Sequence, residues 1–136
     1  MNTVGESYVD DDCLYLGGDP RLRLRGSAEV AITPDGIRMT VIDRHTGQRA
    51  NAWLPRGDLT AATYASRRLG MEQAESELDV EIGEFEHITL HAVTLGVRDP
   101  EGVATDGLQI EIGFSDDYRA RVFEKRCRTA FGLAPF

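Results

Sequence analysis

The sequence predicts a mainly β domain of the α+β class: a small antiparallel barrel or roll of six or seven strands, capped by a C-terminal amphipathic helix. Apolar residues alternate with polar ones in several short runs that glycine, proline and aspartate separate, which is typical of half-buried strands joined by turns. The last apolar run has helical spacing instead. A length of 136 residues with 41% apolar residues indicates one globular domain.

The N-terminal region predicts a leader and then a hairpin. The first twelve residues are polar and end in three aspartates, so we expect a mobile leader over 1–12 and a single domain over 13–136. Cys13–Leu16 and Arg21–Arg25 flank the turn-rich quartet Gly17–Pro20. These two runs predict a first hairpin.

The clearest local pattern is a hairpin around Pro34–Gly36. The apolar alternation over 28–32 resumes over 37–41, and between the two runs proline presets φ while glycine accepts a positive φ. Residues 44–47 predict a second turn, and Ala50–Leu54 a further strand that ends at Pro55.

Residues 58–70 have two interpretations. Asp58 can cap a short helix that Gly70 ends, with Leu59 and Leu69 on one face. The same residues can continue the sheet, because Thr60, Ala62 and Tyr64 alternate. We favour the helix, with the strand as the alternative.

The second half of the chain begins with an acidic segment, 71–86, which has seven carboxylates and no basic residue and predicts a strand or a loop. Strands follow over 87–97 and 108–114, separated by a loop over 99–107.

The C-terminal helix is predicted over 116–131. Ser115 is the expected N-cap, Gly132 is the C′ residue, and Pro135 prevents continuation. The predicted core combines the alternating strand residues with the apolar arc of this helix: Val30, Ile32, Ile37, Met39, Val41, Trp53, Ile88, Leu90, Leu108, Ile110, Ile112, Phe114, Phe123, Cys127 and Phe131.

Charge and motifs exclude several function classes. A net charge of −8 repels nucleic acid and anionic membranes. No nucleophile elbow or phosphate-binding loop is present, so we expect neither an enzyme nor a cofactor. We also expect no metal, because His87 and His91 lie about 13 Å apart on a strand. Cys13 and Cys127 predict reduced, structural thiols. Without a signal peptide or a long apolar run, we expect a cytoplasmic protein.

Two basic groups are candidate binding residues. Arg21, Arg23 and Arg25 would project from one face of a strand, about 6–7 Å apart, which matches adjacent phosphates. Arg121, Lys125 and Arg128 line the C-terminal helix opposite its apolar arc. The plainer interpretation of both groups is solubility, or pairing with the acidic segment 71–86.

The expected function is that of a non-catalytic interaction or adaptor domain. A groove between a capping helix and an open strand edge can bind an extended protein segment. The helical cations favour an acidic segment of a partner protein, or a second copy of this chain as a homo-oligomer. A small ligand stays open as an alternative.

Three stretches resemble the pleckstrin-homology (PH-like) superfold, which includes GRAM domains. Ile32–Ile37 resembles its first hairpin, Trp53–Leu59 a step into a new strand, and Leu108–Phe131 the last strand with the terminal helix. The resemblance covers about residues 27–132 and implies a β-barrel closed by a helix.

A second resemblance is to PilZ domains, six-stranded barrels with a C-terminal helix that bind cyclic di-GMP. Arg21–Arg25 is similar to their Arg-x-x-x-Arg element. Their second element falls at Asp43–Gly47, where His45 replaces the expected serine. This resemblance implies the alternative function of a small-ligand module in which Arg21 and Arg25 bind the nucleotide.

Overall fold

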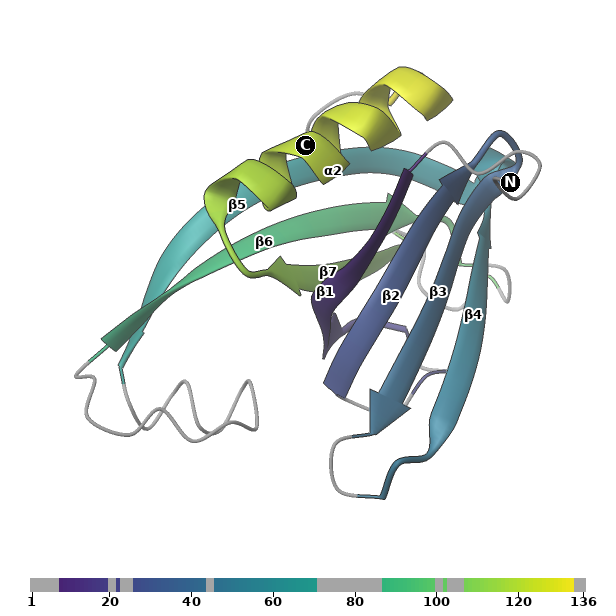
Figure 1. The fold of residues 1–136 in the computed structure, drawn as a ribbon. Coiled ribbons are helices and arrows are strands. Elements are labelled where there is room, and N and C mark those ends of the chain that lie inside the picture. The colour runs from purple at the N-terminus through teal and green to yellow at the C-terminus, as the bar shows by residue number, and fades with distance from the viewer. Residues whose placement is uncertain are drawn as a thin grey trace.

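The computed structural model describes residues 8–19, 22, 26–43, 46–70, 87–99, 102 and 107–133. Seven strands form a strongly curved sheet, and helix α2 packs against it (Figure 1). In chain order the elements are β1 (Tyr8–Gly17), β2 (Gly26–Thr33), β3 (Gly36–Asp43), β4 (Arg49–Pro55), the 3₁₀ turn η1 (Arg56–Asp58), β5 (Leu59–Gly70), β6 (His87–Val97), β7 (Leu108–Phe114) and α2 (Asp117–Phe131).

The strands lie in the order β4-β3-β2-β1-β7-β6-β5, and every neighbouring pair is antiparallel. The predicted fold class is therefore confirmed. The sheet is a roll that does not close into a barrel, since β4 and β5 are its two edges. These edge strands follow one another in sequence, with only η1 between them.

The predicted hairpin at Pro34–Gly36 is confirmed. Thr33 and Gly36 pair across a two-residue turn, and Gly36 has a φ of 155°. A Cβ atom on Gly36 would collide with the backbone carbonyl of Leu54 in β4. Glycine at this position therefore also lets β4 pack closely against the turn.

The prediction of a leader up to Asp12 is wrong for residues 8–12, which belong to β1. Asp10 is buried there and accepts hydrogen bonds from the Tyr8 hydroxyl at 3.1 Å and the Asp12 backbone N–H at 2.9 Å. Arg119 of α2 pairs with the same carboxylate at 3.3 Å. This part-buried ion pair links β1 to the helix. Residues 1–7 lie outside the described residues.

β1 pairs with β2 from residue 26 onward and with β7 on its other side. The predicted first hairpin between 13–16 and 21–25 stays a prediction, because most of its second run lies outside the described residues. Of that run the structure describes Leu22, whose side chain is buried in the core. The arginines at 21, 23 and 25 lie outside the described residues, as does the acidic segment 71–86.

The favoured helix over 58–70 is wrong, and the strand alternative is correct. β5 pairs with β6 from Leu59 opposite Val97 to Gly70 opposite His87. This ladder satisfies backbone groups along the whole strand, which outweighs a weak helical spacing.

The C-terminal helix is confirmed, with a shift of one residue at its start. Asp116 is the N-cap in place of Ser115, and its carboxylate accepts the Arg119 backbone N–H at 2.7 Å. Gly132 ends the helix in the left-handed region with a φ of 64°. Within the described ranges, no helix has both the length and the apolar character needed to cross a bilayer.

The core lies between the concave face of the sheet and α2. Phe123 is fully buried, with ring centres 5.1 Å from Phe114 and 6.0 Å from Tyr8. Most of the predicted core is confirmed in this cluster: Val30, Ile32, Ile37, Met39, Val41, Ile110, Ile112, Phe114, Phe123, Cys127 and Phe131 are buried. Leu90 is also buried, but in a separate small cluster with Leu69 and Ala92. Leu108 is half-buried, and the side chain of Ile88 is not among those described. Trp53 is the exception: its side chain is 44% exposed, because it points outward from an edge strand whose Leu54 faces the core.

Candidate functional site: the open edge of the sheet

The edge strand β4 has a strand neighbour on one side only, which is β3. Two bonds at its ends show which residues face β3. The Asp43 N–H donates to the Gln48 carbonyl at 2.7 Å, and the Arg56 N–H donates to the Asp35 carbonyl at 2.8 Å. Along an antiparallel pair, every second residue exchanges backbone hydrogen bonds with the partner strand. Counting from Gln48 and Arg56, the β4 residues that form backbone hydrogen bonds with β3 are Ala50, Ala52 and Leu54.

The remaining β4 residues, Arg49, Asn51 and Trp53, direct their backbone N–H and C=O groups away from β3. In the part of the chain that the structure describes, these outward groups have no bonding partner. Pro55 has no N–H to offer, so it ends the series. The open edge is thus short, with three residues able to pair with an added strand.

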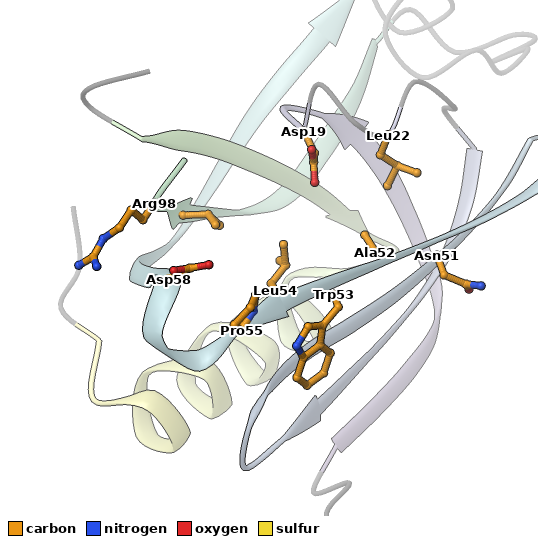
Figure 2. A pocket seen from close by; sticks show the side chains of 10 residues that line it. Asp19, Leu22, Asn51, Ala52, Trp53, Leu54, Pro55, Asp58 and Arg98 are labelled. Carbon is orange, nitrogen blue, oxygen red and sulfur yellow. The ribbon is translucent and has the colours of Figure 1, made fainter. Parts of the chain in front are cut away.

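A groove with a volume of about 400 Å³ runs beside this edge (Figure 2). Residues 51–55 of β4 form one wall of the groove, and the apolar residues Leu22 and Val97 line it from other parts of the chain. Asp19, Asp58 and Arg98 also line the groove. The groove therefore lies against the margin of the hydrophobic core, next to unpaired backbone groups, although Leu22, Leu54 and Val97 are themselves nearly fully buried.

The outer side of β4 has a different character. The Trp53 ring lies on the opposite side of the strand from the Leu54 side chain (Figure 2), although Trp53 also lines the groove. In the β3–β4 ladder, Trp53 lies opposite Arg38 of β3. The next side chains along β4 on the same face as Trp53 are Asn51 and Arg49. Tryptophan and arginine are the residues that most often dominate binding energy at protein interfaces.

The charge around β4 is also distinct from that of the whole chain. The chain has a net charge of −8, yet residues 44–57 include three arginines and no carboxylate. Arg49 and Arg56 of this stretch are exposed on the structure. A negatively charged partner is therefore attracted to the outer side of this edge in particular.

The opposite edge, β5, is covered by α2 at Tyr64. The Tyr64 backbone N–H donates to the carboxylate of Glu124 on α2 at 2.6 Å. The guanidinium of Arg121 lies 4.9 Å from the centre of the Tyr64 ring, and the Tyr64 hydroxyl is 3.1 Å from Nδ1 of His91. Since α2 occupies this edge, a partner strand cannot bond β5 at Tyr64.

The structure places the three helical cations of the predicted site along α2. Arg121 pairs with Asp117 at 3.6 Å, and Arg128 pairs with Glu124 at 3.0 Å. Lys125 lies on a shallow outer surface of the helix with Tyr118 and Arg126. Arg121 and the Glu124 partner Arg128 therefore lie near the Tyr64 end of this contact and already have acidic partners on the helix, whereas Lys125 lies on the outer surface.

The other predicted binding residues, Arg21, Arg23 and Arg25, are not among the residues described. Both cysteines are free and buried. Over the described ranges, no group of three or more histidine, cysteine, aspartate or glutamate side chains is arranged to hold a metal ion.

In comparisons with known proteins, no family model matches the chain, and neither a curated protein nor a solved structure matches it. The resemblances to PH-like and PilZ domains stay predictions.

Proposed function

We propose that this chain is a non-catalytic interaction module that binds an extended, acidic protein segment as an additional strand on the open edge of β4. The observation that carries the proposal is the row of outward backbone groups at Arg49, Asn51 and Trp53 beside an apolar groove. In strand addition, main-chain hydrogen bonds supply affinity, and pockets for alternate side chains supply specificity. The arginines of residues 44–57 favour an acidic occupant over a basic one.

The proposal moves the binding surface away from the helical cations. A groove between the capping helix and a strand edge was expected, with Arg121, Lys125 and Arg128 beside it. Glu124 occupies that edge at Tyr64, whereas β4 offers both an edge and a groove. An acidic, extended segment remains the partner in both cases.

Trp53 gives a direct test, since it is the single tryptophan of the chain and lies on the proposed site. The probe is an eight-residue peptide in which valine and glutamate alternate. We expect a saturable change in tryptophan fluorescence on titration, because an added strand removes water from the indole ring. Asn51→Pro removes an outward N–H without breaking the β3 ladder, so it is expected to weaken binding at least about tenfold.

The control variant is Lys125→Glu, which changes the charge of the helical surface and leaves β4 intact. We expect it to bind the peptide as the original chain does. No saturable binding to the original chain, or equal binding by Asn51→Pro, would overturn the proposal. A second copy is the competing occupant: a dimer in light scattering that Asn51→Pro dissociates, together with no peptide binding, would also overturn it.

A further inference from the structure

The two sides of β4 differ in chemistry, and this difference dictates the side-chain pattern of the occupant. The inference rests on the proposed function, strand addition to β4. Side chains of an extended segment point alternately to the two faces of a sheet. An added strand therefore places every second side chain in the groove and the others beside Arg49, Asn51 and Trp53.

The groove side rejects acidic side chains. Leu22, Ala52, Leu54 and Val97 supply apolar surface there. The ionisable side chains on this side include the carboxylates of Asp19, which is 4% exposed, and Asp58. A glutamate entering the groove would lose water and approach the carboxylate of Asp58. Arg98 lines the same groove, but its side chain is exposed at the rim.

The outer side favours acidic side chains. Arg49 is exposed, and its side chain points to the same face of the sheet as those of Asn51 and Trp53. Arg38 lies across from Trp53, with its guanidinium 4.0 Å from Glu29 and nearly half-exposed. A carboxylate on the occupant can pair with Arg49 while the apolar stem of its side chain contacts the indole ring.

We infer that the occupant is an extended segment with strict period-two alternation, in which uncharged apolar side chains enter the groove and carboxylates lie on the outer side near Arg49. A segment of the same composition without this alternation would have to bury a carboxylate or expose its apolar residues. The position of the acidic residues, and not only their number, therefore determines affinity.

Two isomeric peptides separate this inference from the proposed function. One alternates valine and glutamate over eight residues, and the other has the same residues in pairs, Val-Val-Glu-Glu repeated twice. We expect the alternating peptide to bind at least about tenfold tighter in the Trp53 fluorescence titration. Equal affinities would overturn the inference and leave strand addition standing. Binding of neither peptide would overturn the proposed function as well.

Charge reversal tests the assignment of the outer side. Arg49→Glu is expected to weaken the alternating glutamate peptide about tenfold and to strengthen a peptide that alternates valine and lysine. Arg126→Glu makes the same change in net charge on the exposed surface of α2 and is expected to alter neither affinity. If both variants behave alike, the acidic side chains do not lie beside Arg49 and the inference fails.

Discussion

The two edge strands of the sheet, β4 and β5, differ in how much of their backbone is exposed to solvent. β5 is twelve residues long, and α2 packs along it, with Glu124 bonding a backbone N–H that points out of the sheet. β4 is seven residues long, and no described helix covers it. An exposed edge is a risk for aggregation, which proteins reduce with short strands, charges and proline. β4 has all three features, yet it keeps three open residues beside an apolar groove.

This difference shows that the fold covers its long edge at Tyr64, where α2 bonds it, and leaves its short edge available. Among the described residues, α2 is the one α-helix, and its apolar face is used in the core under β5 and β6. Covering β4 as well would need another element. An edge that is short, bounded by proline and flanked by arginines limits non-specific pairing while it allows a defined partner to bind.

The largest expected effect comes from removing the side chain that anchors α2 in the core. Phe123→Ala removes a fully buried ring that contacts Phe114 and Tyr8, and we expect it to lower the free energy of unfolding by about 3–5 kcal/mol. Urea denaturation measures the change. Tyr118→Ala on the same helix is the control, because Tyr118 is 74% exposed, and it should stay within about 0.5 kcal/mol. Similar losses in both variants would mean that α2 is not anchored through Phe123.

The next effect tests which backbone N–H groups of β4 point away from β3. Ala52→Pro removes an N–H that bonds β3, so it should cost about 2–3 kcal/mol, whereas Asn51→Pro removes an outward N–H. Asn51→Pro also loses the side-chain bond from Thr40 at 2.9 Å, an exposed contact worth about 0.5–1 kcal/mol. Thermal and urea unfolding compare the two variants. If Asn51→Pro is the more damaging change, the open groups belong to the other set of β4 residues.

The sequence predicts the locally determined elements well. The β2–β3 hairpin follows from alternation around Pro34–Gly36, and α2 follows from its spacing, caps and the buried Phe123. Residues 58–70 could not be assigned locally, since their partner is β6, at least seventeen positions further on at Gly70 and His87. The outward direction of Trp53 was readable from the inward alternation of its neighbours. That β4 is an edge was not readable, because strand order depends on pairings across the whole chain.

The third effect concerns thiols buried in the core. Burial raises the pKa of Cys127 on α2, with a smaller contribution from Glu124, and burial also raises the pKa of Cys13, helped by Asp10. The unfolded thiols release their protons near pH 8.5, while the native thiols stay protonated. Because the native pKa is the higher one, the contribution of the buried thiols to the free energy of unfolding is fully present below about pH 8.5 and is lost as the pH rises above it.

We expect each thiol to cost about 2 kcal/mol of stability at pH 10 relative to pH 7. Urea denaturation across this range measures the loss. Cys127→Ala should reduce the dependence on pH by about half, whatever its effect at pH 7, and a dependence equal to that of the original chain would show that α2 does not shield the Cys127 thiol.

The smallest effect isolates the bond that covers β5. Glu124→Ala leaves the half-buried Tyr64 N–H without its acceptor and also removes the partner of Arg128, so we expect a loss of about 1–2 kcal/mol. The Tyr64 amide should then exchange its hydrogen with solvent about tenfold faster. Glu124→Gln keeps a carbonyl oxygen in the same place and should restore most of the protection, even though it loses the charge that pairs with Arg128. Exchange at Asn51 and Trp53 should already be fast in the original chain, since their amides point into open solvent. If the Tyr64 amide is equally fast before any substitution, both edges are open and the contrast between them disappears.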